Sequence, residues 1–287
     1  MSAGTAVPGT AAPGAARSGI WDVLSTCTSG CITHAAPRVP LAGAARRAAS
    51  FAHVLLRAAA DRDRLAEPGR LRRHARASLA ALGVGLVHDG PPLRVAADAT
   101  GGPGTLVVVN HISWLDILAL LAVEPVTMLA KQEVGGWPVM GPLARRAGTR
   151  FIDRSSPRGL PQAVADLAAE LRDGRSVVVF PQATTWCSAT EGGFRRATFQ
   201  AAIDAGAPVR PVTVRYLQHG APSTVPAFVG EEDLASSLRR VLTASALTAR
   251  VTVHPPLLPG TRDRRDLAAV TEAVILGRRP AEPAAHA

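Results

Sequence analysis

The chain has 287 residues, and 47% of them are hydrophobic, which is enough apolar material to bury the core of a large folded domain. Its 32 basic and 22 acidic residues give a net charge of +10, and this excess, almost all of it arginine, favours an anionic partner such as a membrane surface. The aromatic content of 4% argues against the stacking surfaces that bind single-stranded nucleic acid, and we expect no nucleic-acid partner.

Two further features of the sequence narrow the cellular setting. The three cysteines are too few for a disulfide framework in a chain of this length, which favours a reducing cytoplasm. The first residues form a Pro/Gly/Ala tract without the charged start and apolar centre of a secretory signal. The sequence also lacks a run of about 18 uncharged apolar residues, so we expect any membrane-bound form to lie on the bilayer rather than cross it.

The N-terminal part of the chain is predicted to be a tail followed by a pair of helices. Residues 1–37 begin with small residues and prolines that bury little surface, and we expect this tail to be disordered. Residues 38–83 carry apolar side chains at helical spacing, and the second helix is expected to cover 71–82 and to end at Gly83. The pair either packs on the main domain or lies as a basic amphipathic extension in an anionic membrane surface.

From residue 84 the pattern changes to alternating strands and helices. Short β-branched segments predict strands at 105–109, 126–130, 149–153, 176–180, 209–215 and 250–254. Segments with helical periodicity lie between them, at 114–123, 138–147, 160–172, 195–205 and 232–246. This alternation predicts an α/β fold with a mixed, largely parallel sheet flanked by helices, in a domain of residues 84–277 that is followed by a tail at 278–287.

The segment at 107–116 contains the strongest candidate for catalysis. An apolar strand ends at Asn110 and His111, and a helix is expected to begin directly afterwards, so the turn can bring the carboxylate of Asp116 to the imidazole. A carboxylate that binds one ring nitrogen fixes the tautomer and leaves the other nitrogen to accept a proton. A structural alternative exists, because Ser113 and Asp116 also fit a capping box at the start of the helix.

Four short motifs follow one another along the α/β region. The first is NHxSxxD, formed by Asn110, His111, Ser113 and Asp116. The others are FIDR at 151–154, FPQATTW at 180–186 and VRPVTV at 209–214. Over residues 84–258 this series resembles the lysophosphatidic acid acyltransferase family, the PlsC-like glycerolipid acyltransferases, whose second motif is FxxR and whose third is usually FPEGT.

The resemblance implies an enzyme that moves an acyl group from coenzyme A or acyl carrier protein to the hydroxyl of a lysophospholipid, most simply lysophosphatidate, at the cytoplasmic face of a membrane. It implies that His111 is the general base, that Asp116 orients it and that Arg154 binds the acceptor phosphate. Neither a metal nor a cofactor is expected. The other residues expected to contact the substrate are Asn110, Ser113, Lys131, Phe151, Pro181, Gln182, Thr184 and Thr185.

The third motif departs from the family pattern at two positions. Gln182 replaces a glutamate and so removes a charge, while Ala183 replaces a glycine and penalises a backbone with positive φ. Both changes are expected to affect the acceptor site. They leave open a different acceptor, such as lyso-ornithine lipid, and a catalytically weak lipid-binding homologue.

The N-terminal tail also contains potential metal ligands. Cys27, Cys31 and His34 have suitable side chains, but their spacing differs from that of common zinc knuckles and a fourth ligand is not evident. Cys187 is predicted to be a buried or partly exposed thiol. The sequence therefore predicts no metal site.

Overall fold

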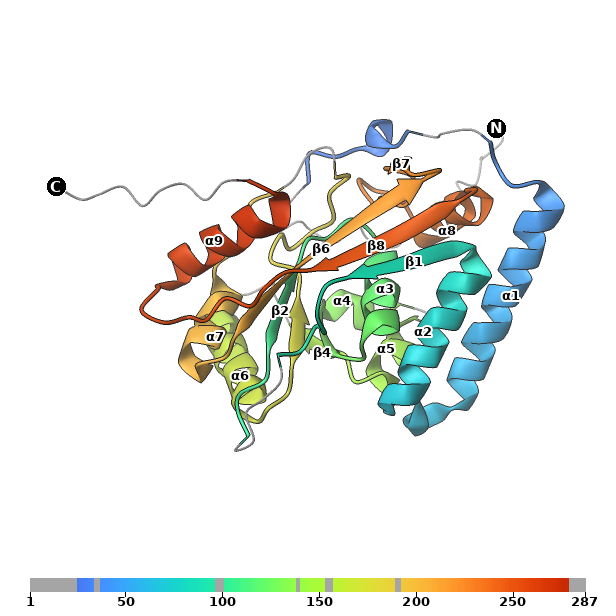
Figure 1. Ribbon diagram of the computed structural model, residues 1–287. Helices are drawn as coiled ribbons and strands as arrows, with labels where there is room; N and C mark the ends of the chain where they lie inside the picture. Colours follow the sequence, from blue (N-terminus) through green and yellow to red (C-terminus); the bar gives the residue numbers. More distant parts are fainter. Residues whose placement is uncertain are drawn as a thin grey trace, which may run out of the picture.

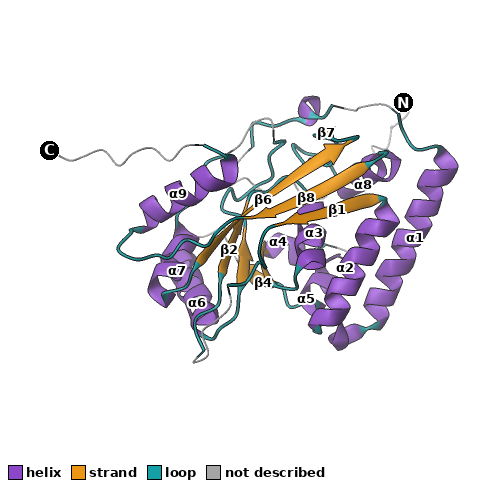
Figure 2. Cartoon of the chain, viewed as in Figure 1, coloured by secondary structure: helices purple, strands orange, loops and turns teal. Residues whose placement is uncertain are grey.

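The computed structural model describes residues 25–33, 37–95, 101–137, 140–152, 157–188 and 192–278. It consists of one sheet with helices on both faces (Figures 1 and 2), which confirms the predicted α/β fold. Four parts of the sequence-based predictions lie outside the described residues: the tail at 1–24, His34 within 34–36, Arg154, and residues 279–287 of the C-terminal tail.

The sheet is mixed and largely parallel, as predicted. Its strands follow the order β1-β8-β6-β2-β5-β3-β4, with β7 paired to β6. Neighbouring strands are parallel, except that β6 runs antiparallel to both β7 and β8. The bounds are β1 Val84–Asp89, β2 Leu106–Val109, β3 Thr127–Lys131, β4 Arg150–Ile152, β5 Val177–Val179, β6 Val209–Gln218, β7 Ala221–Pro222 and β8 Leu247–Val253. The sequence pattern does not predict β1, because this strand contains the weak strand formers Gly85 and Asp89. It is the outermost strand at one side of the sheet and is stabilised by its parallel pairing with β8.

Helices lie before, between and after the strands. Their bounds are α1 Leu41–Ala60, α2 Pro68–Leu82, α3 Leu115–Val123, α4 Gln132–Gly135, α5 Met140–Arg146, α6 Leu160–Arg172, α7 Ala197–Ala205, α8 Leu234–Thr243 and α9 Arg264–Leu276, with 3-10 turns η1 Ser29–Cys31, η2 Arg62–Ala66 and η3 Pro157–Gly159. The prediction does not include α9, although its ends carry clear signals. The Asp263 carboxylate caps its first turn by accepting from the N–H groups of Arg265 and Asp266, and Gly277 ends it with a φ of 66°.

Strand β2 is buried on both faces because it lies near the middle of the sheet. Val107 and Val109 belong to a core shared with α2 and α3, whereas Leu106 and Val108 belong to a second core shared with α6, α7 and α9. All four side chains have 0% exposure, which explains the continuous apolar sequence of this strand. The parallel strands β2 and β5 end at the same edge of the sheet, where ligands bind in α/β folds.

The predicted N-terminal helical pair is α1 and α2, and it packs on the main domain. Helix α2 contacts α3, while α1 contacts α2 and α8. Gly83 ends α2 with a φ of 74°, as the sequence predicts. The Nε atoms of Arg72 and Arg76 lie 3.3 Å and 2.9 Å from the carbonyl oxygen of Ala122, near the end of α3. Among the described residues, no helix combines the length and the apolar character needed to cross a bilayer.

Residues 25–33 differ from the predicted disordered tail of residues 1–37. They form the turn η1 and lie against the α/β domain, with the Cys27 side chain only 2% exposed. The backbone N–H of Thr33 donates to the hydroxyl of Thr224, 2.8 Å away. The low apolar content of the tail does not reveal these contacts, because they depend on residues far away in the sequence.

Candidate active site

The imidazole of His111 and the carboxylate of Asp116 form a direct hydrogen bond at the end of β2. Nδ1 of His111 lies 2.9 Å from Oδ2 of Asp116, across the turn that leads into α3. The Asp116 side chain has 0% exposure, while 20% of the His111 side chain is exposed. The buried carboxylate of Asp116 therefore fixes the imidazole through Nδ1. The other ring nitrogen, Nε2, is left as the atom that can accept a proton.

Three further donors reach the carboxylate of Asp116. Oδ2 accepts the backbone N–H groups of Ile112 and Ser113 at 2.7 Å and 2.9 Å, and Oδ1 accepts the Tyr216 hydroxyl at 2.7 Å. Burial, together with the charge and hydrogen bond of Asp116, raises the pKa of Tyr216 well above its ordinary value, so the phenol remains a donor. The lone pairs of a carboxylate without access to water are thereby satisfied.

Tyr216 is a site residue that the sequence-based prediction misses. The predicted strand ends at residue 215, whereas β6 continues to Gln218 and has Tyr216 on the same face as Val212 and Val214. The sequence does contain an indication of this position, because Val212, Val214 and Tyr216 are apolar or aromatic at every second residue, which continues the strand pattern beyond the fourth motif.

The ring of Phe180 covers one face of the His111 imidazole. The two ring centroids are 4.1 Å apart, with an angle of 22° between the planes. Phe180 follows β5, and the register Val108↔Val179 brings the end of that strand beside the end of β2. This stacking limits the rotation of the imidazole, so the sheet register itself orients the candidate base.

Gln182, which the sequence predicts to contact the substrate, makes hydrogen bonds to two backbone groups, one of them in His111. Its Oε1 accepts the backbone N–H of His111 at 2.7 Å, and its Nε2 donates to the carbonyl of Gly192 at 3.3 Å. The side-chain orientation is defined because an N–H donor requires the amide oxygen opposite it. Gln182 is 2% exposed and therefore positions His111. A glutamate would retain the first bond but would bring a carboxylate oxygen against the Gly192 carbonyl.

Asn110 and Ser113, both predicted to contact the substrate, make structural hydrogen bonds. The Asn110 side chain joins β2 to β6, because its Nδ2 donates to the Val214 carbonyl and its Oδ1 accepts the Val214 N–H, at 2.9 Å and 2.8 Å. The Ser113 hydroxyl accepts the Leu115 N–H at 3.2 Å, and Asp116 accepts the Ser113 N–H. The capping interaction and the His111–Asp116 hydrogen bond therefore coexist, since both use Asp116.

The remaining predicted residues lie at the ends of β3, β4 and β5, apart from Arg154, which is outside the described residues. Lys131 ends β3 and pairs in register with Ile152, while Phe151 belongs to β4. Pro181 is buried, and Thr184 and Thr185 are half-buried in the loop after β5. The Thr185 hydroxyl donates to the Phe228 carbonyl. Strands β2, β3, β4 and β5 are parallel, so their carboxyl ends point in the same direction. The predicted residues therefore lie at the same end of the sheet as His111.

Ala183 has a backbone φ of 63°, a left-handed conformation that a glycine adopts without a steric penalty. This conformation costs a residue with a Cβ about 1–2 kcal/mol. We expect Ala183→Gly to raise the free energy of unfolding by roughly 0.5–1 kcal/mol after the entropy of glycine in the unfolded chain is included. Thermal unfolding followed by circular dichroism measures the effect. Ala49→Gly, on the exposed face of α1, is the matched control and should lower stability by about 1 kcal/mol; an equal loss in both variants would contradict the prediction.

A hydrogen-bonded His-Asp pair at the carboxyl ends of the strands of an α/β sheet can activate a hydroxyl group. Residues 93–215 match the Acyltransferase family model. The chain belongs to this family and is an acyltransferase.

Two curated relatives illustrate the similarity. The 1-acyl-sn-glycerol-3-phosphate acyltransferase of Neisseria meningitidis serogroup B is 39% identical over 177 residues, which cover 61% of this chain and 67% of the relative. The lyso-ornithine lipid O-acyltransferase of Pseudomonas aeruginosa is 36% identical over 178 residues, with coverage of 61% and 67%. Among solved structures, the 1-acyl-sn-glycerophosphate acyltransferase PlsC of Thermotoga maritima shares the fold, with a TM-score of 0.56 and 20% identity over 79% of this chain and 85% of that chain.

Proposed function

We propose that this acyltransferase moves an acyl group from a thioester of coenzyme A or acyl carrier protein to the hydroxyl of a lysophospholipid, converting lysophosphatidate to phosphatidate. The observation that carries this proposal is the His111–Asp116 hydrogen bond, which fixes a partly exposed imidazole from the protein interior. The relatives named 1-acyl-sn-glycerol-3-phosphate acyltransferase support the choice of acceptor.

The proposed mechanism uses the substrate hydroxyl as the nucleophile. Nε2 of His111 removes the hydroxyl proton while the oxygen attacks the thioester carbonyl, and the carboxylate of Asp116 stabilises the imidazolium that forms. When the tetrahedral intermediate collapses, the C–S bond breaks and the imidazolium returns the proton to the departing thiolate. The ester and a thiol are the products. The scheme needs no enzyme nucleophile, metal or cofactor.

The acceptor phosphate is proposed to bind at the ends of β3, β4 and β5. Arg154 follows the last residue of β4 by two positions, and its planar guanidinium suits a phosphomonoester. Lys131 ends the neighbouring strand, in register with Ile152. Thr184 and Thr185 add hydroxyl groups at the same edge.

Lyso-ornithine lipid is the second candidate acceptor. Relatives from Pseudomonas aeruginosa and Rhodobacter capsulatus are named lyso-ornithine lipid O-acyltransferases and are 36% and 35% identical to this chain. An ornithine headgroup carries an amine and a carboxylate instead of a phosphate. A guanidinium binds a carboxylate as well as a phosphate, so the two candidates are separated by their relative rates as acceptors and not by the presence of an arginine.

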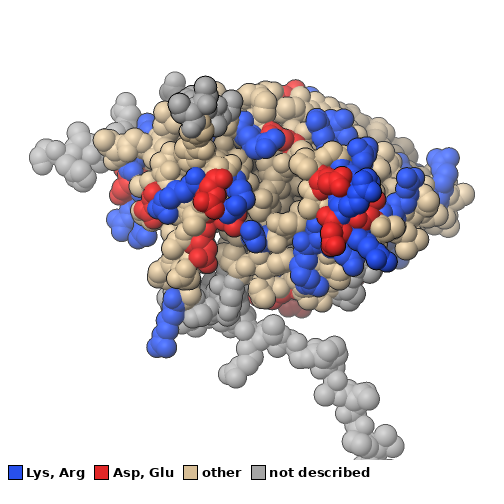
Figure 3. Space-filling view, turned by 90° about the horizontal axis from the view of Figure 1, so that it is seen from below, with Lys and Arg blue, Asp and Glu red and all other residues tan. Residues whose placement is uncertain are grey.

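We propose that the enzyme acts from the cytoplasmic surface of an anionic membrane. Leu41 and Leu56 of α1 are 85% and 70% exposed, and they offer apolar contacts to a bilayer. On the face shown in Figure 3, basic side chains are mixed with acidic ones. Arg70 pairs with both Asp61 and Glu67. The electrostatic attraction to anionic lipid is therefore expected to be modest and salt-dependent.

An acceptor screen tests the proposed function. Purified enzyme, oleoyl-coenzyme A and one lysolipid at a time should release free thiol fastest with lysophosphatidate. Arg154→Ala should raise the KM for lysophosphatidate by about 10-fold or more, since a charge-assisted bidentate contact contributes about 1.5–3 kcal/mol. Arg158→Ala, an exposed arginine in the turn η3, is the matched control.

Each outcome of the screen separates the candidates. Faster turnover of lyso-ornithine lipid than of lysophosphatidate would replace lysophosphatidate as the acceptor. Thiol release that does not depend on any lysolipid would contradict the transfer reaction itself.

A further inference from the structure

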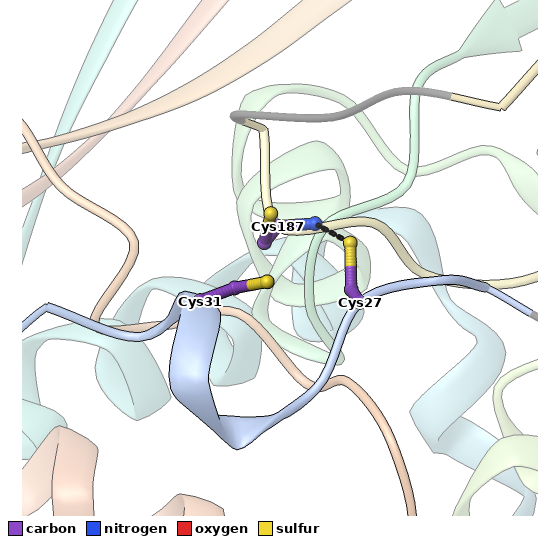
Figure 4. A group of neighbouring side chains, drawn as sticks. All are labelled: Cys27, Cys31 and Cys187. Carbon is purple, nitrogen blue, oxygen red and sulfur yellow. Dashed lines mark hydrogen bonds between the residues drawn. The ribbon is translucent and has the colours of Figure 1, made fainter.

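Three cysteines from two distant parts of the chain meet beside the loop that follows β5 (Figure 4). Cys27 and Cys31 belong to the segment around the turn η1, and Cys187 comes directly after Trp186. Their three sulfur atoms all lie within 4.8 Å of one another. The backbone N–H of Cys187 also donates to Sγ of Cys27 at 3.4 Å, a contact between residues 160 positions apart. These three residues are all the cysteines of the chain.

The geometry of the three sulfur atoms is close to that of a thiolate metal site. Zinc binds thiolate sulfur at about 2.3 Å, so three sulfurs of one tetrahedral ion lie about 3.8 Å apart. From the observed limit of 4.8 Å, the sulfurs need to move together by roughly 1 Å. Cys27 and Cys187 are 2% and 0% exposed, so their positions are fixed by packing. Cys31 is partly exposed, so an ion can reach the sulfur atoms from solvent.

We propose that Cys27, Cys31 and Cys187 bind a soft metal ion through three thiolates, with Zn²⁺ as the ion expected in the protein. Thiolate ligands select such ions over the hard cations that prefer oxygen. Three S–H bonds break and three S–Zn bonds form, so binding releases three protons and requires no oxidant or reductant. The fourth tetrahedral position is left for a water molecule.

The proposed ion would connect the N-terminal segment to the loop that supports the active site. The backbone N–H of Trp186, one residue before Cys187, donates to the carbonyl of His111 at 2.8 Å. The C-terminal end of the N-terminal segment, at Thr33, is held by the hydrogen bond from the Thr33 N–H to the Thr224 hydroxyl. The metal is therefore expected to stabilise the support of His111 and to have no part in the proton transfer.

Cobalt substitution of the intact, reduced protein tests the proposal. With Zn²⁺ removed and Co²⁺ added, we expect thiolate-to-cobalt charge-transfer absorption and about one bound ion per chain. Cys31→Ser leaves two of the three thiolates, so it should lower the intensity of this absorption and weaken Zn²⁺ binding by about 10-fold or more. Because Cys31 is partly exposed, this variant is expected to fold, and circular dichroism checks that it does.

A control variant and a second measurement make the test decisive. Ser29→Ala, in the same turn, should leave the cobalt spectrum unchanged. Zn²⁺ should raise the Tm of the wild-type protein and of Ser29→Ala by more than it raises the Tm of Cys31→Ser. Absent charge-transfer absorption in the reduced wild-type protein would overturn the proposal. The proposal would also be overturned if the protein purified without a reducing agent had a mass lower by two hydrogen atoms, because two of the three cysteines would then form a disulfide instead of binding a metal.

Discussion

Replacing His111 with alanine is expected to lower kcat for acyl transfer by about 10²–10⁴-fold, the range that general-base catalysis contributes. The loss should appear in kcat rather than in the KM for either substrate, because the imidazole acts on the proton in transit. Release of free thiol from an acyl thioester, measured with saturating lysolipid, gives this value directly.

The fold should tolerate His111→Ala, which makes the result interpretable. The backbone N–H of His111 binds Gln182 and its carbonyl binds the Trp186 N–H, and both contacts survive the substitution. The chain also offers a matched control. His74 and Asp61 form a similar pair on the helical extension, with 2.8 Å between Nε2 and Oδ2 and a histidine side chain that is 19% exposed. His74→Ala should keep full activity, and a His111→Ala variant with comparable turnover would exclude His111 as the base.

The hydrogen bond between His111 and Asp116 could be predicted from sequence because it is a local feature. His111 and Asp116 are five positions apart, on either side of a strand-to-helix turn that the apolar run at 106–109 makes recognisable. The same reasoning places the third motif at the end of a second strand. Hydrophobic periodicity also predicts most of the sheet and helix α6, because burial on one or both faces leaves a clear pattern in the sequence.

The support around the pair could not be predicted, because it depends on contacts between distant residues. Tyr216 reaches Asp116 across 100 positions, and Gln182 reaches His111 across 71. The motif alone predicts a contact between Gln182 and the substrate and does not reveal its two hydrogen bonds to backbone groups. Cys187 likewise reads as an isolated thiol until the fold brings Cys27 and Cys31 beside it. Residue types alone do not distinguish a group that touches the substrate from one that holds its neighbour.

Asp116→Asn is the second substitution with a large expected effect, and it separates charge from shape. The amide is isosteric: its oxygen can accept from His111, Ile112 and Ser113, while its nitrogen can donate to the hydroxyl oxygen of Tyr216. The fold should therefore survive with a modest loss of stability. The negative charge that stabilises the imidazolium is lost, so kcat is expected to fall by up to about 10⁴-fold, the loss that the same change causes in a Ser-His-Asp triad, where the histidine tautomer changes as well.

Tyr216→Phe is the companion variant, because it removes a single donor and keeps the charge of Asp116. A hydrogen bond to a charged group contributes about 1.5–3 kcal/mol, and here that loss should appear mainly in the free energy of unfolding, with kcat reduced far less than in Asp116→Asn. Urea unfolding and thiol-release kinetics on the same samples measure the two quantities. If Asp116→Asn retained wild-type turnover, the shape of the side chain and not its charge would account for the role of Asp116. If Tyr216→Phe reduced kcat as strongly as Asp116→Asn does, the loss could not be assigned to the charge, because Tyr216→Phe leaves that charge in place.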